Sequence, residues 1–106
     1  MANVNSGMRP IWQLVLADMV AYSVRMGIYT DHLPAAVAEQ LRAERAAKGI
    51  TYDRLAQLTG MSKFTVMRYL KQERSIPLPE FAALSEALGL APVEVMRRAM
   101  ERIPQG

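Results

Sequence analysis

The 106-residue sequence contains no cysteine and a single histidine, His32. Without cysteine the chain has no disulfides, thiolate zinc sites or cysteine nucleophiles. One histidine excludes a histidine cluster for a metal ion or an acid–base relay. The carboxylates are scattered along the sequence, so no group of titratable side chains is expected to converge on a pocket. The sequence therefore predicts a protein that is not an enzyme and that needs no metal and no cofactor.

The sequence also lacks a long uninterrupted apolar run. The longest, residues 11–24, contains Gln13, Asp18 and Ser23, and it is too short and too interrupted to span a bilayer. Arg9 is the only cation before it, so the basic region of a signal peptide is missing. These absences predict a soluble, cytoplasmic protein that does not associate with membranes.

The chain does contain enough apolar material for one compact domain, since 51% of its 106 residues are hydrophobic. The net charge of +3 is small but unevenly distributed. Residues 37–76 hold eight Lys and Arg residues against four Asp and Glu residues, which exceeds the imbalance of the whole chain. A localised basic region is expected of a protein with an anionic partner.

Residues 1–9 are small and polar and are predicted to be flexible. An extra apolar helix is predicted in residues 10–29, running from Pro10 to about Met26. Its apolar side chains cover about half of the helix circumference; they are Ile11, Trp12, Val15, Leu16, Met19, Val20, Tyr22 and Met26. A helix this apolar must be buried on more than one side, so a partner subunit is a natural candidate to cover it.

A connection is predicted at Gly27 to Leu33, and a domain of five helices at residues 30–103. The predicted helices are Pro34–Lys48, Tyr52–Thr59, Lys63 to about Lys71, Pro79–Leu88 and Val93–Arg102. The last of them is predicted to place Val93, Met96 and Met100 on one stripe. No segment alternates polar and apolar residues with a period of two, so the fold class is predicted to be all-α.

The stretch 51–70 meets the demands of a tight helix-turn-helix. A small residue, Ala56, stands where two helices would meet, and Gly60, four positions later, suits a turn with positive φ. Val66 follows six positions after Gly60 and would point back at the first helix. Leu55 and Tyr69 complete the predicted small core.

Residues 50–96 resemble the phage-repressor and Cro-like helix-turn-helix family, also called Xre-type or Cro/C1-type. The matching segments are TYDRLAQLTGMSKFTVMRYLKQER, PEFAALSEALGL and APVEVM. The resemblance implies a five-helix, lambda-repressor-like DNA-binding domain, usually of transcriptional repressors that bind operators as dimers. The extra helix at 10–29 lies outside the matching region.

A helical wheel of residues 62–71 places one continuous arc opposite the apolar side of the helix. We call it the exposed arc; it consists of Lys63, Phe64, Met67, Arg68 and Lys71. In the family, the front of this helix enters the major groove. Lys63 and Arg68 are predicted to donate to guanine, and Phe64 and Met67 to contact thymine methyl groups.

Phosphate contacts are predicted for residues near the ends of these helices, where backbone N–H groups, hydroxyls and cations suit an anion. The predicted phosphate-contacting residues are Thr51, Tyr52, Ser62, Lys71, Arg74 and Arg45.

Each assignment has a structural alternative. The cations of the exposed arc would also serve as an ordinary solvated face, and Phe64 and Met67 as the edge of the core. Arg45 and Arg74 would also be explained as solvated side chains, and Thr51 and Ser62 as helix caps. Arg42 is expected to pair with Glu39 or Glu44 on the helix surface.

The predicted function is sequence-specific DNA binding by a transcriptional regulator, in the manner of a bacterial repressor or a phage immunity repressor. The predicted partner is double-stranded operator DNA, bound by a homodimer that forms through the 10–26 helix or the C-terminal helix. The alternative is an antitoxin-like interaction module, whose apolar N-terminal helix binds a different protein.

Overall fold

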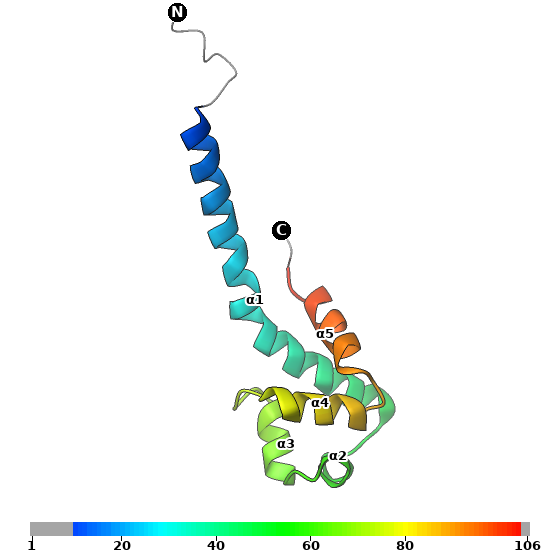
Figure 1. The fold of residues 1–106 in the computed structure, drawn as a ribbon. Helices are drawn as coiled ribbons and strands as arrows, with labels where there is room; N and C mark the ends of the chain where they lie inside the picture. Colours follow the sequence, from blue (N-terminus) through cyan, green and yellow to red (C-terminus); the bar gives the residue numbers. More distant parts are fainter. Residues whose placement is uncertain (1–9, 105–106) are drawn as a thin grey trace, which may run out of the picture.

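The computed structural model describes residues 10–104, apart from the side chains of residues 20–26. This part of the chain forms five helices and no strand (Figure 1); they are α1 (Ile11–Lys48), α2 (Tyr52–Thr59), α3 (Lys63–Leu70), α4 (Leu78–Ala87) and α5 (Pro92–Glu101). The predicted all-α fold is confirmed. The segment predicted to be flexible, residues 1–9, lies outside the described residues.

The predicted connection at Gly27 to Leu33 is wrong, because α1 continues through it as a helix of 38 residues. The extra N-terminal helix and the first helix of the domain are therefore one element. Pro34 lies inside α1, and Figure 1 shows that the helix changes direction in its cyan stretch, which contains this residue. A proline within a helix kinks it without necessarily ending it, and the burial of Val37 and Leu41 just after Pro34 favours continuation.

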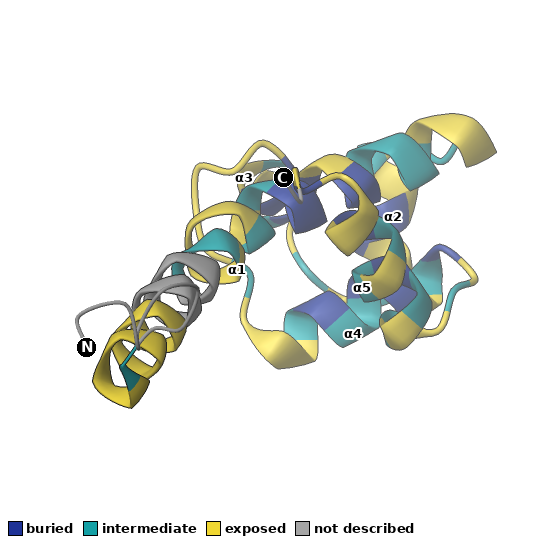
Figure 2. Ribbon diagram, turned by 90° about the horizontal axis from the view of Figure 1, so that it is seen from above, coloured by how far each residue is buried: buried dark blue, intermediate teal, exposed yellow. Residues whose placement is uncertain are grey.

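The core lies where the second half of α1 packs with the four short helices. Figure 2 shows the buried residues gathered there. Each helix contributes at least one side chain with no exposed surface: Leu41, Leu55, Val66, Leu70, Leu84 and Val95. The predicted small core of the helix-turn-helix is confirmed, since Ala56 and Tyr69 are buried as well.

The stripe predicted for the last helix is not the face that α5 buries. Val93 is 75% exposed and Met100 is 38% exposed, whereas Val95 and Ala99 are completely buried. Val95 and Ala99 are four residues apart and so lie on one face of α5. This face packs into the core, and Ile103 continues it one turn later with 3% exposure.

The N-terminal part of α1 projects away from this core (Figure 1). Its residues 11–19 are all exposed, and Figure 2 shows them in yellow at the end of the helix. We call residues 11–19 the apolar arm. Among the described residues, no helix is both long enough and apolar enough to cross a membrane.

Candidate nucleic-acid interface

Three residues determine where α2 begins and ends and where α3 begins. The Thr51 hydroxyl caps α2 by accepting a hydrogen bond from the Arg54 N–H at 3.0 Å. Gly60 ends α2 with φ 75°, a conformation in which glycine avoids the strain that a side chain meets. The Ser62 hydroxyl then caps α3 by accepting from the Thr65 N–H at 3.1 Å. These local interactions fix where α3 begins and how it leaves the turn.

The two sides of α3 differ in burial as the sequence predicts, except at Met67, which belongs to the exposed arc but is half-buried. Val66, Tyr69 and Leu70 are buried, whereas Lys63 and Arg68 in the exposed arc face solvent. Phe64 is 71% exposed, so it does not form an edge of the core. A phenylalanine so exposed on a helix of a small domain leaves a large apolar surface in water. The exposed arc therefore combines cations with a large apolar side chain that is mostly exposed.

Lys63 has a partner on α2. Its ammonium nitrogen lies 3.4 Å from a carboxylate oxygen of Asp53. The two side chains are 48% and 69% exposed, and an ion pair this exposed contributes about 0–1 kcal/mol to stability. Lys63 therefore loses little when its ammonium group leaves Asp53 for another anion.

Arg45 and Tyr52 contact each other at the start of α2. The Arg45 guanidinium carbon lies 4.4 Å from the centre of the Tyr52 ring. The same guanidinium donates a hydrogen bond to the Ile50 carbonyl at 2.9 Å. Arg45 therefore holds the segment that leads into α2, and its phosphate contact stays a prediction.

The other predicted phosphate contacts lie at the two ends of α3. Ser62 and Lys71 are exposed, and Lys71 is the residue at which the helix ends. Arg74 is exposed, with its guanidinium carbon 5.8 Å from the centre of the Tyr69 ring. Ser62 and Arg74 flank the exposed arc along the chain, and Lys71 is its last member, so the positions of all three are compatible with backbone contacts on either side of a groove.

Two cations of α1 have structural roles that the sequence did not reveal. Arg42 donates a hydrogen bond to the carbonyl of Leu70, at the end of α3. Lys48 donates to the carbonyl of Leu88, at the end of α4. The predicted pairing of Arg42 with Glu39 or Glu44 is wrong. The last carbonyls of a helix lack partners within it and attract cations, and Arg42 donates to one of these carbonyls instead. The partners in these two hydrogen bonds are 28 and 40 residues apart in the sequence, so no local pattern could have predicted them.

The turn after α3 contains a strained residue, Gln72. It has φ 64°, and it is followed by a hydrogen bond from the Glu73 N–H to the Arg68 carbonyl at 2.9 Å. This arrangement is the Schellman ending of a helix, in which glycine is the preferred residue. The chain thus has glutamine at a position where the backbone conformation favours glycine.

Gln72→Gly is expected to stabilise the fold by about 0.5–1 kcal/mol, because it removes the left-handed strain. Lys71→Gly is the matched control. Lys71 has φ −88°, so glycine there relieves no strain and is expected to destabilise the fold. Urea unfolding followed by far-UV circular dichroism compares the two variants. A loss of stability in Gln72→Gly would show that the glutamine side chain itself stabilises the turn.

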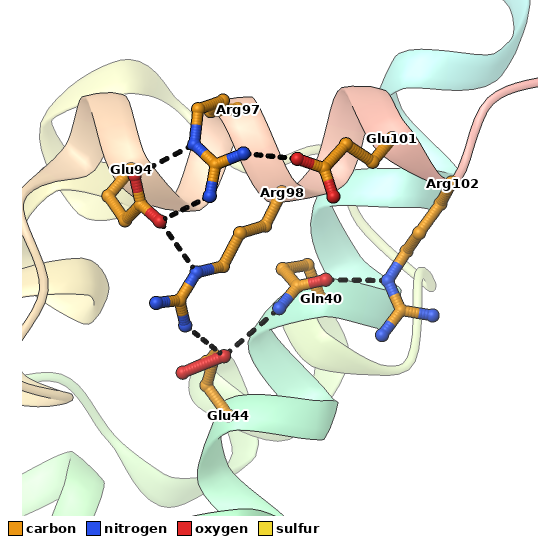
Figure 3. A network of polar contacts seen from close by, with 7 residues as sticks. All are labelled: Gln40, Glu44, Glu94, Arg97, Arg98, Glu101 and Arg102. Atoms are coloured by element: carbon orange, nitrogen blue, oxygen red, sulfur yellow. Dashed lines mark hydrogen bonds and ion pairs between the residues drawn. The ribbon is translucent and has the colours of Figure 1, made fainter.

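A network of polar side chains joins α5 to α1 (Figure 3). The Arg98 guanidinium donates to Glu44 of α1 and to Glu94 of its own helix, both at 2.8 Å. Arg102 donates to Gln40 at 2.6 Å, and the amide of Gln40 donates to Glu44 at 3.0 Å. The network lies at the α1–α5 contact, and all of the exposed arc belongs to α3 or its end. Its role is therefore to fix α5 on the domain.

Glu94 is held in its charged form by this network. Hydrogen bonds from Arg97 and Arg98 lower its pKa from 4.5 to about 2. Because the pKa in the folded state is the lower one, the contribution of Glu94 to stability is complete above about pH 4.5 and is lost as the pH falls towards 2.

Glu94→Gln is therefore expected to lower stability near neutral pH and to approach the wild type as the pH is lowered into this range. Urea midpoints measured at a series of pH values give the comparison. Glu86→Gln, on the exposed side of α4 and outside the network, is the matched control. A constant difference between Glu94→Gln and wild type across the range would contradict the assigned cause.

The model of the helix-turn-helix domain family matches residues 36–99, which is more than half of the chain. The chain belongs to the helix-turn-helix domain family. The match begins within the second half of α1 and ends in α5, so it covers the core and leaves out the apolar arm. Membership of this family supports a DNA-binding transcriptional regulator and confirms the family predicted from residues 50–96.

The fold is similar to that in the crystal structure of the clp gene regulator ClgR from C. glutamicum. The two structures agree with a TM-score of 0.65 over 70% of this chain and 96% of that chain, at 24% sequence identity. At this identity the similarity establishes the shared fold. A comparison of the sequence with curated proteins finds no match.

Proposed function

We propose that the protein is a sequence-specific transcriptional repressor, of the bacterial or phage immunity type, that occupies operator DNA in the cytoplasm. The observation that carries the proposal is the composition of α3, which buries Val66 and Leu70 and turns Lys63, Phe64 and Arg68 towards solvent. An α-helix fits the major groove of B-DNA. Occupation of an operator by a domain of this size excludes polymerase from the same DNA.

The exposed arc divides into two kinds of base contact. Arg68 and Lys63 donate to the N7 and O6 acceptors of guanine, and Lys63 does so at the small cost of leaving Asp53. Phe64 and Met67 contact the methyl groups of thymine. A site with both guanine and thymine on its contacted strands is therefore expected.

The phosphate contacts position α3 and add affinity that does not depend on sequence. We assign them to six residues at the helix ends and on α1: Thr51, Tyr52, Ser62, Lys71, Arg74 and Arg45. For Thr51 and Ser62 the hydroxyl already caps a helix, so the neighbouring backbone N–H groups make part of the contact.

Selection of duplexes from a random pool by the full chain tests this proposal. Enrichment of a defined motif is expected, with an affinity that falls steeply as the salt concentration rises because phosphate contacts release counterions. A pool that stays random after repeated selection would contradict sequence-specific binding.

A second candidate function is that of an antitoxin-like module that binds a different protein. The projecting apolar arm favours it, because six large apolar side chains are exposed there. The solubility of the isolated chain distinguishes the two candidate functions. A chain that stays soluble and well defined alone supports the repressor, and one that requires a different chain for solubility supports the interaction module.

A further inference from the structure

The apolar arm exposes more hydrophobic surface than a monomer usually leaves in water. Ile11 is 77% exposed, Trp12 and Met19 are each 59% exposed, and Val15 and Leu16 are each about half exposed. At about 100° per residue these five side chains lie on one side of the helix. Together they expose on the order of several hundred Å², which is the scale that one partner contributes to a stable interface.

A groove at the foot of the arm is apolar and open. It has a volume of about 380 Å³, far more than the roughly 30 Å³ that a water molecule takes. It lies between α1, the loop after α3 and the start of α4, and its walls include Leu33, Val37, Leu78, Phe81 and Met96. Leu78 is 74% exposed. The groove therefore presents apolar walls that nothing in the same chain covers among the described residues.

We propose that the apolar arm of one copy of this chain lies in the groove of a second copy, and that the exchange is reciprocal. The arm and the groove are both apolar. The arm is the N-terminal part of α1, and later residues of α1 line the groove. In a twofold dimer each arm lies in the groove of the other copy, so both arms and both grooves are covered and no further copy can add.

The charges of the two surfaces agree with this occupant. Asp18 is the one charged residue of the arm, residues 11–19. Among the described side chains that line the groove, Arg74 is the one charged residue. Insertion of the arm brings the carboxylate of Asp18 to the wall that contains Arg74, so the charges of the arm and the groove are opposite. The guanidinium of arginine has five N–H donors, so a pair with Asp18 leaves donors on Arg74 for the assigned phosphate contact.

The helical spacing also agrees with a dimer that binds DNA, which is the proposed function. The arm is centred near residue 15, and the part of α1 that lines the groove runs from Tyr29 to Ala38. Two antiparallel α1 helices that match these regions set the two grooves roughly 28 Å apart along the helix, at 1.5 Å per residue. The loop after α3 lines each groove, so the separation of the two α3 helices is expected to be of the same order as the roughly 34 Å between half-sites one DNA turn apart.

Sedimentation equilibrium of the full chain and its variants tests the exchange. Val15→Glu places a charge on the arm, and Leu78→Glu places one at the exposed wall of the groove. The wild type is expected to be a dimer, and each variant is expected to dimerise at least about tenfold more weakly. Circular dichroism checks that both variants keep the helix content of the wild type.

A mixture of the two variants gives the sharper result. In a heterodimer, the intact arm of the Leu78→Glu copy meets the intact groove of the Val15→Glu copy, so one of the two contacts is restored. Mixing is therefore expected to produce more dimer than either variant alone. A dimer that resists Leu78→Glu but not Val15→Glu would overturn the proposal, because arms would then pair with arms.

Charge reversal and a helix-stiffening change complete the test. Asp18→Arg and Arg74→Asp are each expected to weaken the dimer, and the double variant to recover it. Gly27→Ala is expected to keep the dimer. Among the described residues an added Cβ would meet only Asp31, at 3.5 Å, and alanine favours a continuous helix. A wild type that is monomeric, or a dimer lost in Gly27→Ala, would overturn the proposal. These measurements are made without DNA. A negative result would therefore contradict the arm exchange but not the proposed DNA binding, which the selection of duplexes from a random pool tests separately.

Discussion

Arg68→Ala is expected to weaken binding to the selected operator by about 1–3 kcal/mol, with the loss concentrated at one base position. Arg68 is exposed on the arc opposite the buried face of α3, and arginine contacts guanine through two parallel hydrogen bonds. Once the alanine is present, every base at that position meets the same apolar side chain. Discrimination at that position therefore disappears, whereas preferences at the other positions remain.

Binding of both proteins to a panel of single-base variants of the operator provides the measurement. Arg97→Ala is the matched control, because Arg97 is 58% exposed and lies on α5, away from the exposed arc. It removes the same charge and is expected to leave the base preferences unchanged. A uniform loss across the panel for Arg68→Ala would instead assign Arg68 to a phosphate.

Leu70→Ala is expected to lower the free energy of unfolding by about 2–5 kcal/mol, the largest effect on stability among the changes considered. Leu70 has no exposed surface, and it is the last residue of α3. Its backbone carbonyl accepts the hydrogen bond from Arg42. The variant therefore leaves a cavity at the point where α3 is attached to α1, and weaker DNA binding is expected to follow from the loss of a defined α3.

Urea unfolding at equilibrium measures this effect, and Leu58→Ala on α2 is the matched control. Leu58 is 47% exposed, so the same substitution there removes much less buried surface and is expected to cost less than about 1 kcal/mol. Equal losses in the two variants would mean that the packing of Leu70 does not determine the stability of this core.

The helix-turn-helix was predictable because its geometry restricts individual residues. Only a small side chain fits where α2 meets α3, and only glycine suits the turn without strain, so Ala56 and Gly60 stand out in the sequence. Buried Val66 and Tyr69 confirm the same pattern from the structure. Short-range rules of this kind give the position of α3 and the face that it buries.

The course of α1 was not predictable from the same rules. Gly27 and Pro34 are signals that end helices, and each one alone would support a connection. The outcome depends on packing that the sequence does not display, because the residues after Pro34 bury Val37 and Leu41 in the core. The buried face of α5 differs from the predicted stripe for a related reason, since the face that packs into the core is set by the tertiary arrangement.

The candidate interface was predictable in its location but not in its contacts. The exposure of Phe64 follows from the helical wheel, and the structure excludes its alternative role in the core. The contact between Arg45 and Tyr52 and the bond from Arg42 to Leu70 join distant or differently oriented parts of the chain. Helical periodicity identifies which side chains share a face, and it does not identify which cation reaches a neighbouring helix.

Chemical-shift mapping of the ¹⁵N-labelled chain with the selected duplex tests most directly that α3 is the DNA-contacting element. The largest changes are expected for the backbone amides of residues 62–71 and for those at the start of α2, with only small changes along the polar network of α5. Changes concentrated on α5 or on residues 11–19, with residues 62–71 unaffected, would contradict the central claim.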